Sequence, residues 1–221
     1  MLSLIDRLYS DNTGEKLKAQ IVKNDSLKRY RTLYFENLVD FRLCPKNANT
    51  TMKHVYCQLM FNNDMNFSTN QRSIEYFKNI KYIQQDDPFL FRKSSYKICI
   101  KRDPIERALS AAKYILKHRL NIPHPTLDEI NELLNNISID LDFHFNSQTF
   151  WMGSSDMYDA VYDISELDSL VDWLINDYRY YDIVNKKKNI SESNIKTKDL
   201  PINILKKIKK FYEIDYDNGW Y

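Results

Sequence analysis

The chain has 221 residues, of which 43% are hydrophobic, and its formal net charge at pH 7 is +2. This length and apolar content suit one domain over 1–221 with a substantial hydrophobic core. The near-balanced charge gives no reason to expect a nucleic-acid partner, because such proteins carry a strong basic excess. No apolar run approaches the roughly 18 residues that a membrane span requires, and charge at Asp6 and Arg7 comes too early for a secretory signal.

In chain order, the pattern predicts a charged, roughly helical N-terminal segment over about 1–37 and a core over about 38–221. Strands are expected where short apolar runs end at turn residues, over 38–44, 96–101 and 160–162. Helices are expected where capping residues precede a helical pattern, from Thr50 or Thr51 to about Met60, from Pro104 to about Leu120, over 127–136, from Ser165 to about Asn176 and over 201–212. Residues 61–94 are expected to be irregular, with a helix around 71–80. Alternating strands and helices predict an α/β fold in which helices flank a mainly parallel central sheet.

Glycine and cysteine are informative because both are scarce. The chain has only three glycines and none neighbours another, so neither G-x-G-x-x-G nor G-x-x-x-x-G-K-[ST] can be written. Cys44, Cys57 and Cys99 lie in apolar stretches, which predicts buried free thiols in a reducing compartment. We therefore expect a soluble, cytoplasmic protein. The bias toward Asn, Ile, Lys and Tyr is typical of AT-rich coding sequences and favours a microbial or viral source.

The first strand-to-helix turn, Pro45–Thr51, offers what an anion needs. It combines backbone N–H groups at a helix N-terminus with Lys46 and two threonine hydroxyls. Asn47 and Asn49 tolerate left-handed backbone angles, so we expect them to replace part of the missing glycine. The alternative is an ordinary turn in which the threonines only cap the helix.

The second strand-to-helix turn, Arg102–Ser110, begins with a helix-start signature in which Asp103 is the N-cap and proline follows it. Arg107 and Ser110 lie three residues apart and therefore share one helical face. Arginine offers a planar fork for phosphate oxygens and serine adds a hydroxyl donor. The alternative is a well-capped helix in which Arg107 pairs with an acid.

Five segments, taken together and in order over about 38–221, resemble the sulfotransferase superfamily, especially its carbohydrate sulfotransferase branch. The segments are Pro45–Thr51, Arg102–Ser110, Asp142–Gln148, Tyr158–Tyr162 and Phe211–Tyr216. The chain departs from the family pattern where Asn49 replaces a serine and Ser147 replaces a proline.

The resemblance implies a P-loop-like fold and transfer of a sulfuryl group from 3′-phosphoadenosine 5′-phosphosulfate (PAPS) to an acceptor hydroxyl, with PAP as product and no metal. It implies that the 5′-phosphosulfate is wrapped by Lys46, Asn47, Ala48, Asn49, Thr50 and Thr51, and that Lys46 is catalytic. Arg102 and Ser110 would hold the 3′-phosphate, and the Asn-x-Ser element at Asn189 and Ser191 would close over the nucleotide. Resemblance to the carbohydrate sulfotransferase branch implies a carbohydrate acceptor. The sequence leaves open a lipid, a phenol or a peptide tyrosine as the acceptor, and it also leaves open the oligomeric state.

A histidine is the natural general base for the acceptor hydroxyl near neutral pH. His144 is the first candidate, because its segment resembles the family and Phe143 and Phe145 would form a partly desolvated pocket around it. A structural histidine is the alternative at this position. His54 is the second candidate for the base, whereas His118 and His124 are expected at the surface.

Two other classes of function remain open. A nucleotide kinase on a related fold would need a Lys-[Ser/Thr] pair at the end of its loop, but in 50–53 the lysine follows the threonines. A non-catalytic nucleotide-binding relative would keep the fold without the chemistry. Lys46, Arg102 and Ser110 argue against that second alternative.

Overall fold

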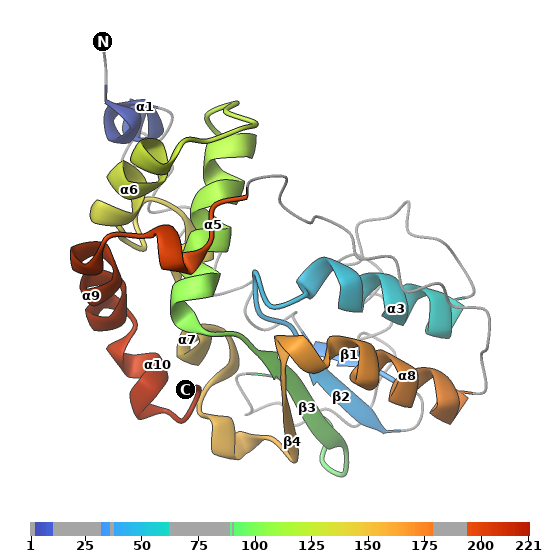
Figure 1. Cartoon of the computed structure of the whole chain (residues 1–221). Coiled ribbons are helices and arrows are strands. Elements are labelled where there is room, and N and C mark those ends of the chain that lie inside the picture. Colours follow the sequence, from blue (N-terminus) through green and yellow to red (C-terminus); the bar gives the residue numbers. More distant parts are fainter. Residues whose placement is uncertain (1–2, 11–31, 36–37, 62–88, 90, 179–193) are drawn as a thin grey trace. The chain divides into compact units, whose positions relative to one another are not determined.

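The computed structural model describes residues 3–10, 32–35, 38–61, 89, 91–178 and 194–221 (Figure 1). The chain divides into two compact units, and we describe each by itself. We call 26–101 with 151–189 the sheet unit, and 1–25, 102–150 and 190–221 the helical unit. Each unit has its own hydrophobic core. That the whole chain acts as one domain stays a prediction.

The sheet unit contains a four-stranded sheet in the order β1-β2-β3-β4. Its strands are β1 (Thr32–Tyr34), β2 (Val39–Arg42), β3 (Tyr96–Lys101) and β4 (Ala160–Asp163). Strand β1 pairs with β2 in antiparallel fashion, whereas β2, β3 and β4 are parallel. The predictions of an α/β fold and of a mainly parallel sheet are confirmed.

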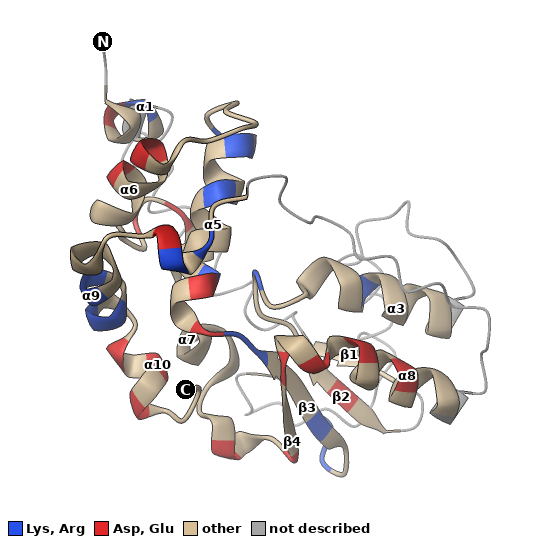
Figure 2. Cartoon of the chain, in the orientation of Figure 1, with Lys and Arg blue, Asp and Glu red and all other residues tan. Residues whose placement is uncertain are grey.

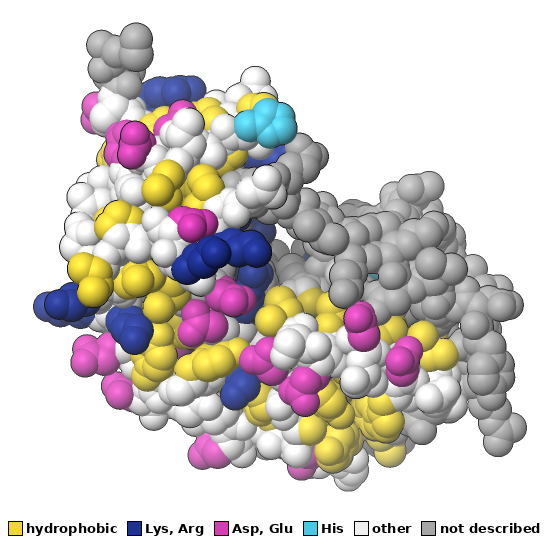
Figure 3. Space-filling model, viewed as in Figure 1, with side chains coloured by type: hydrophobic (Ala, Val, Ile, Leu, Met, Phe, Trp, Pro, Cys, Tyr) yellow, Lys and Arg dark blue, Asp and Glu magenta, His cyan; other side chains and the backbone are white. Residues whose placement is uncertain are grey.

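Two helices of the sheet unit, α3 (Asn49–Phe61) and α8 (Leu167–Tyr178), lie side by side along the sheet (Figure 1). Val39 and Phe41 of β2 pack in one buried cluster with side chains of both helices, including Leu170. Because successive strand residues point to opposite faces, this cluster defines the helix-covered face of the sheet. Asp168 of α8 is exposed, whereas Leu170 is buried, so the helix is amphipathic. Figure 3 shows acidic side chains on this part of the surface.

The residues of β2 that alternate with this cluster are charged and completely buried. Asp40 accepts hydrogen bonds from Arg92 at both carboxylate oxygens, from the side-chain Nε at 2.6 Å and from the backbone N–H at 2.7 Å. Arg42 donates to the carbonyl oxygen of Trp151 (2.9 Å) and to the hydroxyl of Thr32 (3.1 Å). Burial raises the pKa of Asp40, although hydrogen bonds and the charge of Arg92 oppose the rise. These buried bonds join the sheet to segments distant in sequence.

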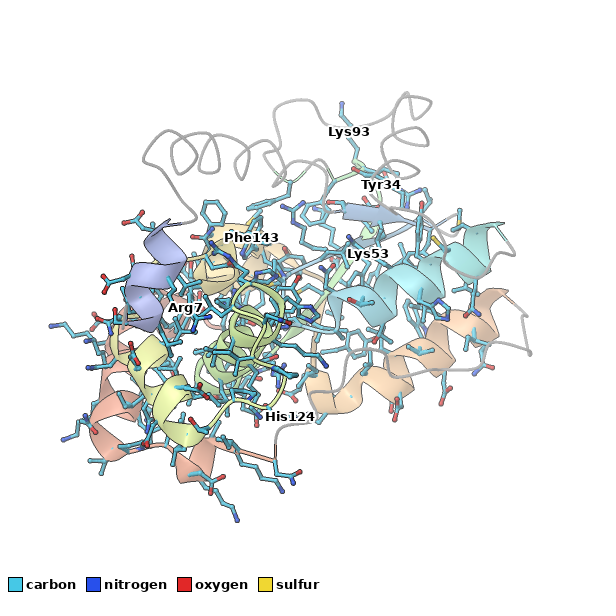
Figure 4. All side chains as sticks on the ribbon, turned by 90° about the horizontal axis from the view of Figure 1, so that it is seen from above. Arg7, Tyr34, Lys53, Lys93, His124 and Phe143 are labelled. Carbon is cyan, nitrogen blue, oxygen red and sulfur yellow. The ribbon has the colours of Figure 1, made fainter. Side chains whose placement is uncertain are left out.

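The helical unit is built around α5 (Pro104–His118), which packs with α6 (Leu127–Asn135) and α9 (Ile202–Phe211). Its shorter helices are α1 (Leu4–Ser10) and α10 (Glu213–Asp217), and α7 (Gln148–Met152) begins in this unit. Helix α1 joins the unit through the backbone N–H of Leu4, which donates to Glu132 (2.9 Å), and through Arg7, labelled in Figure 4, which donates to the carbonyl of Leu120 (3.3 Å).

Most predicted elements occur at the expected positions, and two predictions are wrong. Residues 32–34, expected within a helical segment, form β1 because they pair with β2. Ser165 does not cap α8 but lies in the 3₁₀ turn Ile164–Glu166 before it. Asp163 caps that turn and accepts from the Ser165 N–H (2.9 Å) and hydroxyl (2.7 Å). The helix expected around 71–80 lies outside the described residues.

Cys44, Cys57 and Cys99 are buried free thiols, as predicted. Within the described ranges, no helix combines the length and apolar character needed to cross a bilayer.

Candidate functional site

The turn between β2 and α3 has an unusual backbone. Lys46 adopts φ 70° and Ala48 adopts φ 55°, both in the left-handed region, whereas Pro45, Asn47 and Asn49 keep negative φ. The prediction that the two asparagines take the left-handed angles is therefore wrong. Residues of negative and positive φ thus alternate over 45–49, and the two left-handed residues come directly before the start of α3 (Asn49–Phe61).

The turn is fixed to the neighbouring strand by Asn47. This side chain is 1% exposed, and its amide donates to the carbonyl oxygen of Ile100 on β3 at 2.8 Å. The backbone N–H of Asn47 donates to the carbonyl of Cys44 (3.2 Å), which closes the turn. Because β2 and β3 are parallel neighbours, the turn lies at the carboxyl edge of the sheet, where ligands bind in α/β folds.

The side chains of this turn are polar and differ in burial. Lys46, Asn49 and Thr50 are half-buried, whereas Thr51 is buried. Helix α3 begins at Asn49, and its first backbone bond runs from Met52 to the carbonyl of Ala48 (2.9 Å). The first N–H groups of a helix have no acceptor within it, and the helix dipole favours negative charge there. The turn therefore combines two left-handed residues, a helix N-terminus and a lysine.

The second predicted turn begins the helical unit. As predicted, Asp103 caps α5 by accepting from the N–H groups of Ile105 (2.9 Å) and Glu106 (3.0 Å). Arg102 directly follows β3, and its Nε is 3.5 Å from Glu106. Figure 2 shows basic residues at this junction between β3 and α5. Burial lowers the pKa of Arg102, and the charge of Glu106 opposes this effect. Ser110 is half-buried on α5.

Arg107 is not positioned to bind a nucleotide. It is fully buried, and its Nη2 donates to the carbonyl oxygens of His144 (3.2 Å) and Asn146. Its guanidinium also lies 5.5 Å from the ring centre of Tyr212. Arg107 therefore anchors the 144–146 backbone to α5, a contact that the sequence alone did not indicate.

Three of the segments that carry the family resemblance contact one another in the helical unit. The backbone N–H of Arg102 donates to the Gln148 side chain at 2.9 Å. The backbone N–H groups of Gln148 and Thr149 donate in turn to the carboxylate of Asp215, at 2.9 and 2.8 Å. Asp215 is fully buried. The start of α5, the 142–148 segment and the C-terminal segment thus form one connected set of hydrogen bonds.

His144 lies in a short 3₁₀ turn, Phe143–Phe145, capped by Asp142. Its Nδ1 is 2.6 Å from Asp142 Oδ1, and the other carboxylate oxygen accepts from Arg119 at 3.0 Å. Burial alone would raise the pKa of Asp142, but hydrogen bonds and charge from His144, together with Arg119, hold it below its ordinary value.

Two aromatic rings flank the imidazole of His144. Phe143, labelled in Figure 4, stacks on it at 4.0 Å, and Tyr114 of α5 lies at 4.5 Å between ring centres. The predicted contribution of Phe145 is wrong, because Phe145 is buried in the core of the helical unit. The partly desolvated environment exists, but Tyr114 supplies its second ring.

The other predicted residues have varied positions. His54 is 1% exposed on α3, so an acceptor has little access to it. His118 and His124 are exposed, as predicted. Asn189 and Ser191 lie outside the described residues. In the part of the chain that the structure describes, no group of histidine, cysteine, aspartate and glutamate side chains could hold a metal ion.

A hollow of about 430 Å³ in the helical unit is lined by Lys209, Lys210, Glu213 and Tyr216. None of the predicted site residues lines this hollow, so it is not part of either predicted turn.

Comparison of the chain with known protein families finds no matching family, and comparisons with curated proteins and with solved structures also find no match.

Proposed function

We propose that this protein is a PAPS-dependent sulfotransferase of P-loop-like fold whose acceptor is a carbohydrate hydroxyl. The observation that carries this proposal is the turn over 45–48, which has two left-handed residues and a lysine directly before the N-terminus of α3 without any glycine. The same residues give the sequence its resemblance to the 5′-phosphosulfate loop of sulfotransferases. The helix N-terminus beside Lys46 and the family resemblance, drawn from different observations, both support an anion site at this turn.

The proposed reaction moves a sulfuryl group without a covalent enzyme intermediate. The acceptor oxygen forms a bond to sulfur, the bond from sulfur to the 5′-phosphate oxygen breaks, and the electron pair leaves with PAP. The acceptor proton goes to His144. Lys46 stabilises the negative charge that grows on the leaving phosphate, as a preorganised donor does in phosphoryl transfer. A sulfuryl group carries less negative charge than a phosphoryl group, so the proposed chemistry uses no dedicated metal.

The two ends of the donor have separate assignments. Residues 46–51 hold the 5′-phosphosulfate, and Arg102 and Ser110 hold the 3′-phosphate. The hydrogen bond from the Arg102 backbone N–H to Gln148 supports this second assignment, because it fixes the position from which the Arg102 side chain starts.

The test measures binding of PAP and of adenosine 5′-phosphate by thermal shift and calorimetry. PAP should raise the melting temperature more, because it adds a 3′-phosphate contact made only in the folded state. Arg102→Ala should weaken PAP binding by about 1.5–3 kcal/mol, the value of a charged hydrogen-bond partner, and should leave binding of adenosine 5′-phosphate nearly unchanged. The exposed Lys206→Ala on α9 removes one charge elsewhere and should change neither affinity.

Equal shifts from both nucleotides would contradict the assignment of Arg102 and Ser110. Tighter binding of ATP with Mg²⁺ than of PAP would instead favour a nucleotide kinase. Turnover is then measured with radiolabelled PAPS and a panel of carbohydrate, lipid, phenol and tyrosine acceptors. PAP binding without transfer to any acceptor would favour the non-catalytic alternative.

A further inference from the structure

We propose that Asp142 and Arg119 are positioning residues that hold the proton of neutral His144 on Nδ1 and leave Nε2 as the atom that takes the acceptor proton. This inference rests on the proposed function for its chemistry. Its structural part, the tautomer of His144, can be measured without turnover.

The geometry forms a relay from α5 to the imidazole. Arg119, the C-cap residue of α5, donates from Nη1 to the carbonyl of Leu141 (2.7 Å) and to Asp142 Oδ2 (3.0 Å). Asp142 Oδ1 accepts from the backbone N–H of His144 (2.9 Å) and lies 2.6 Å from its Nδ1. The Asp142 side chain is only 4% exposed. Both carboxylate oxygens are thus engaged, one by each partner.

This arrangement selects one tautomer. Asp142 is ionised near neutral pH because its pKa is held below the ordinary value, and an ionised carboxylate can only accept hydrogen bonds. A 2.6 Å contact with neutral imidazole therefore requires the proton on Nδ1, which leaves the lone pair on Nε2. When Nε2 takes the acceptor proton, the nearby carboxylate stabilises the resulting imidazolium.

Other groups restrain the ring and its backbone. Phe143 and Tyr114 flank the imidazole, and the His118 ring lies 4.5 Å beyond Tyr114. Arg107 binds the carbonyl oxygen of His144 from α5. Among the described residues, the titratable or charged side chains around His144 include Asp142, Arg119, Tyr114, His118 and Arg107. Asp142 contributes the carboxylate that contacts the ring, so the proposal assigns the tautomer to it.

The test uses the full chain labelled with ¹⁵N-histidine, and long-range ¹H–¹⁵N spectra that distinguish the two tautomers. The chain has four histidines, and the spectrum of His144→Asn identifies the signal of His144. In the wild type we expect the Nδ1–H tautomer at a pH where the ring is neutral. Asp142→Asn should shift the ring toward Nε2–H, because the amide of asparagine can donate to Nδ1, and it should lower the pKa at which His144 protonates.

The matched control is Asp140→Asn, which removes an exposed carboxylate two residues away and should leave the spectrum of His144 unchanged. Arg119→Gln frees one oxygen of Asp142 and should weaken the tautomer preference. In the kinetic assay, Asp142→Asn should lower kcat by about 10²–10⁴, the range for loss of general base catalysis, with little change in the KM for PAPS. The acid limb of its pH–rate profile should move to lower pH.

Several results would overturn the proposal. An Nε2–H tautomer in the wild type would do so and requires no variant to fold. An Asp142→Asn spectrum and pH profile matching those of Asp140→Asn would do so as well, as would near wild-type turnover of His144→Asn. A wild-type protein that shows the expected tautomer but transfers sulfuryl to no acceptor would contradict the proposed function and leave the positioning of the ring intact.

Discussion

The left-handed conformation of Ala48 predicts that Ala48→Gly stabilises the protein. An L-residue in this region loses roughly 1–2 kcal/mol through contact of its Cβ with the backbone, and Ala48 adopts φ 55°. Glycine removes that contact, but it gains freedom in the unfolded chain worth about 0.5–1 kcal/mol. The free energy of unfolding should therefore rise by about 0.5–1 kcal/mol, or about 1–4 °C in melting temperature for a chain of this length.

The matched control is Ala160→Gly in β4, the same substitution in the same unit. Ala160 has no left-handed φ, so only the entropic loss remains and stability should fall by about 0.5–1 kcal/mol. Ala48→Val should be destabilising, because a β-branched residue is strained at positive φ. Urea unfolding, followed by circular dichroism and tryptophan fluorescence, measures all three variants.

The opposite signs of the two alanine-to-glycine substitutions are the decisive result. If both variants lose the same stability, residue 48 does not have the left-handed backbone, and the structural argument for an anion site at this turn fails with it. Ala48→Gly should also bind PAP as tightly as the wild type, since it removes no polar side-chain group from the proposed site.

The remaining predictions concern the charges of the sheet unit. Lys46→Met should lower turnover by roughly 10²–10³, the scale for losing one preorganised donor, with a smaller change in PAP affinity. Lys53→Met on α3 (labelled in Figure 4) is the control. Unchanged turnover of Lys46→Met would show that the turn is only a helix cap. Asp40→Asn should lower the free energy of unfolding by about 3–5 kcal/mol, because it leaves the buried Arg92 without its compensating charge. Urea unfolding beside the exposed Asp168→Asn measures this, and equal losses in the two variants would contradict a buried ion pair.

Elements fixed by local chemistry could be predicted from the sequence. The start of α5 follows from Asp103 and Pro104, and the full extent of β3 follows from its apolar run and the signature after it. Strand β1 could not be predicted in the same way. It has only three residues, and its conformation depends on antiparallel pairing with β2 rather than on its own pattern.

The candidate site depends on contacts between distant residues, and these were not predictable from local patterns. Gln148 and Asp215 are 67 residues apart in the chain and hydrogen-bond directly. Arg119 and Asp142 are 23 residues apart, and no capping or periodic signal connects them. The expectation that asparagine supplies left-handed angles at 47 failed because the Asn47 side chain bonds β3 instead. Propensity identified the turn, but a tertiary hydrogen bond decided its conformation.

The conformation of Lys46 is the main physical reason to treat the 45–48 turn as more than a helix cap. A helix cap needs only short side-chain oxygens, so it does not require a lysine in the left-handed region. Lys46 nevertheless adopts φ 70°, where an L-residue loses roughly 1–2 kcal/mol that glycine would not lose. Residues held in such conformations cluster at functional sites, where the surrounding structure over-determines them. Here Pro45 restricts the backbone on one side, and on the other Asn47 is bonded to both Cys44 and Ile100. These restraints fix the backbone that carries Lys46 directly before the N-terminus of α3, which supports the proposed anion site at this turn.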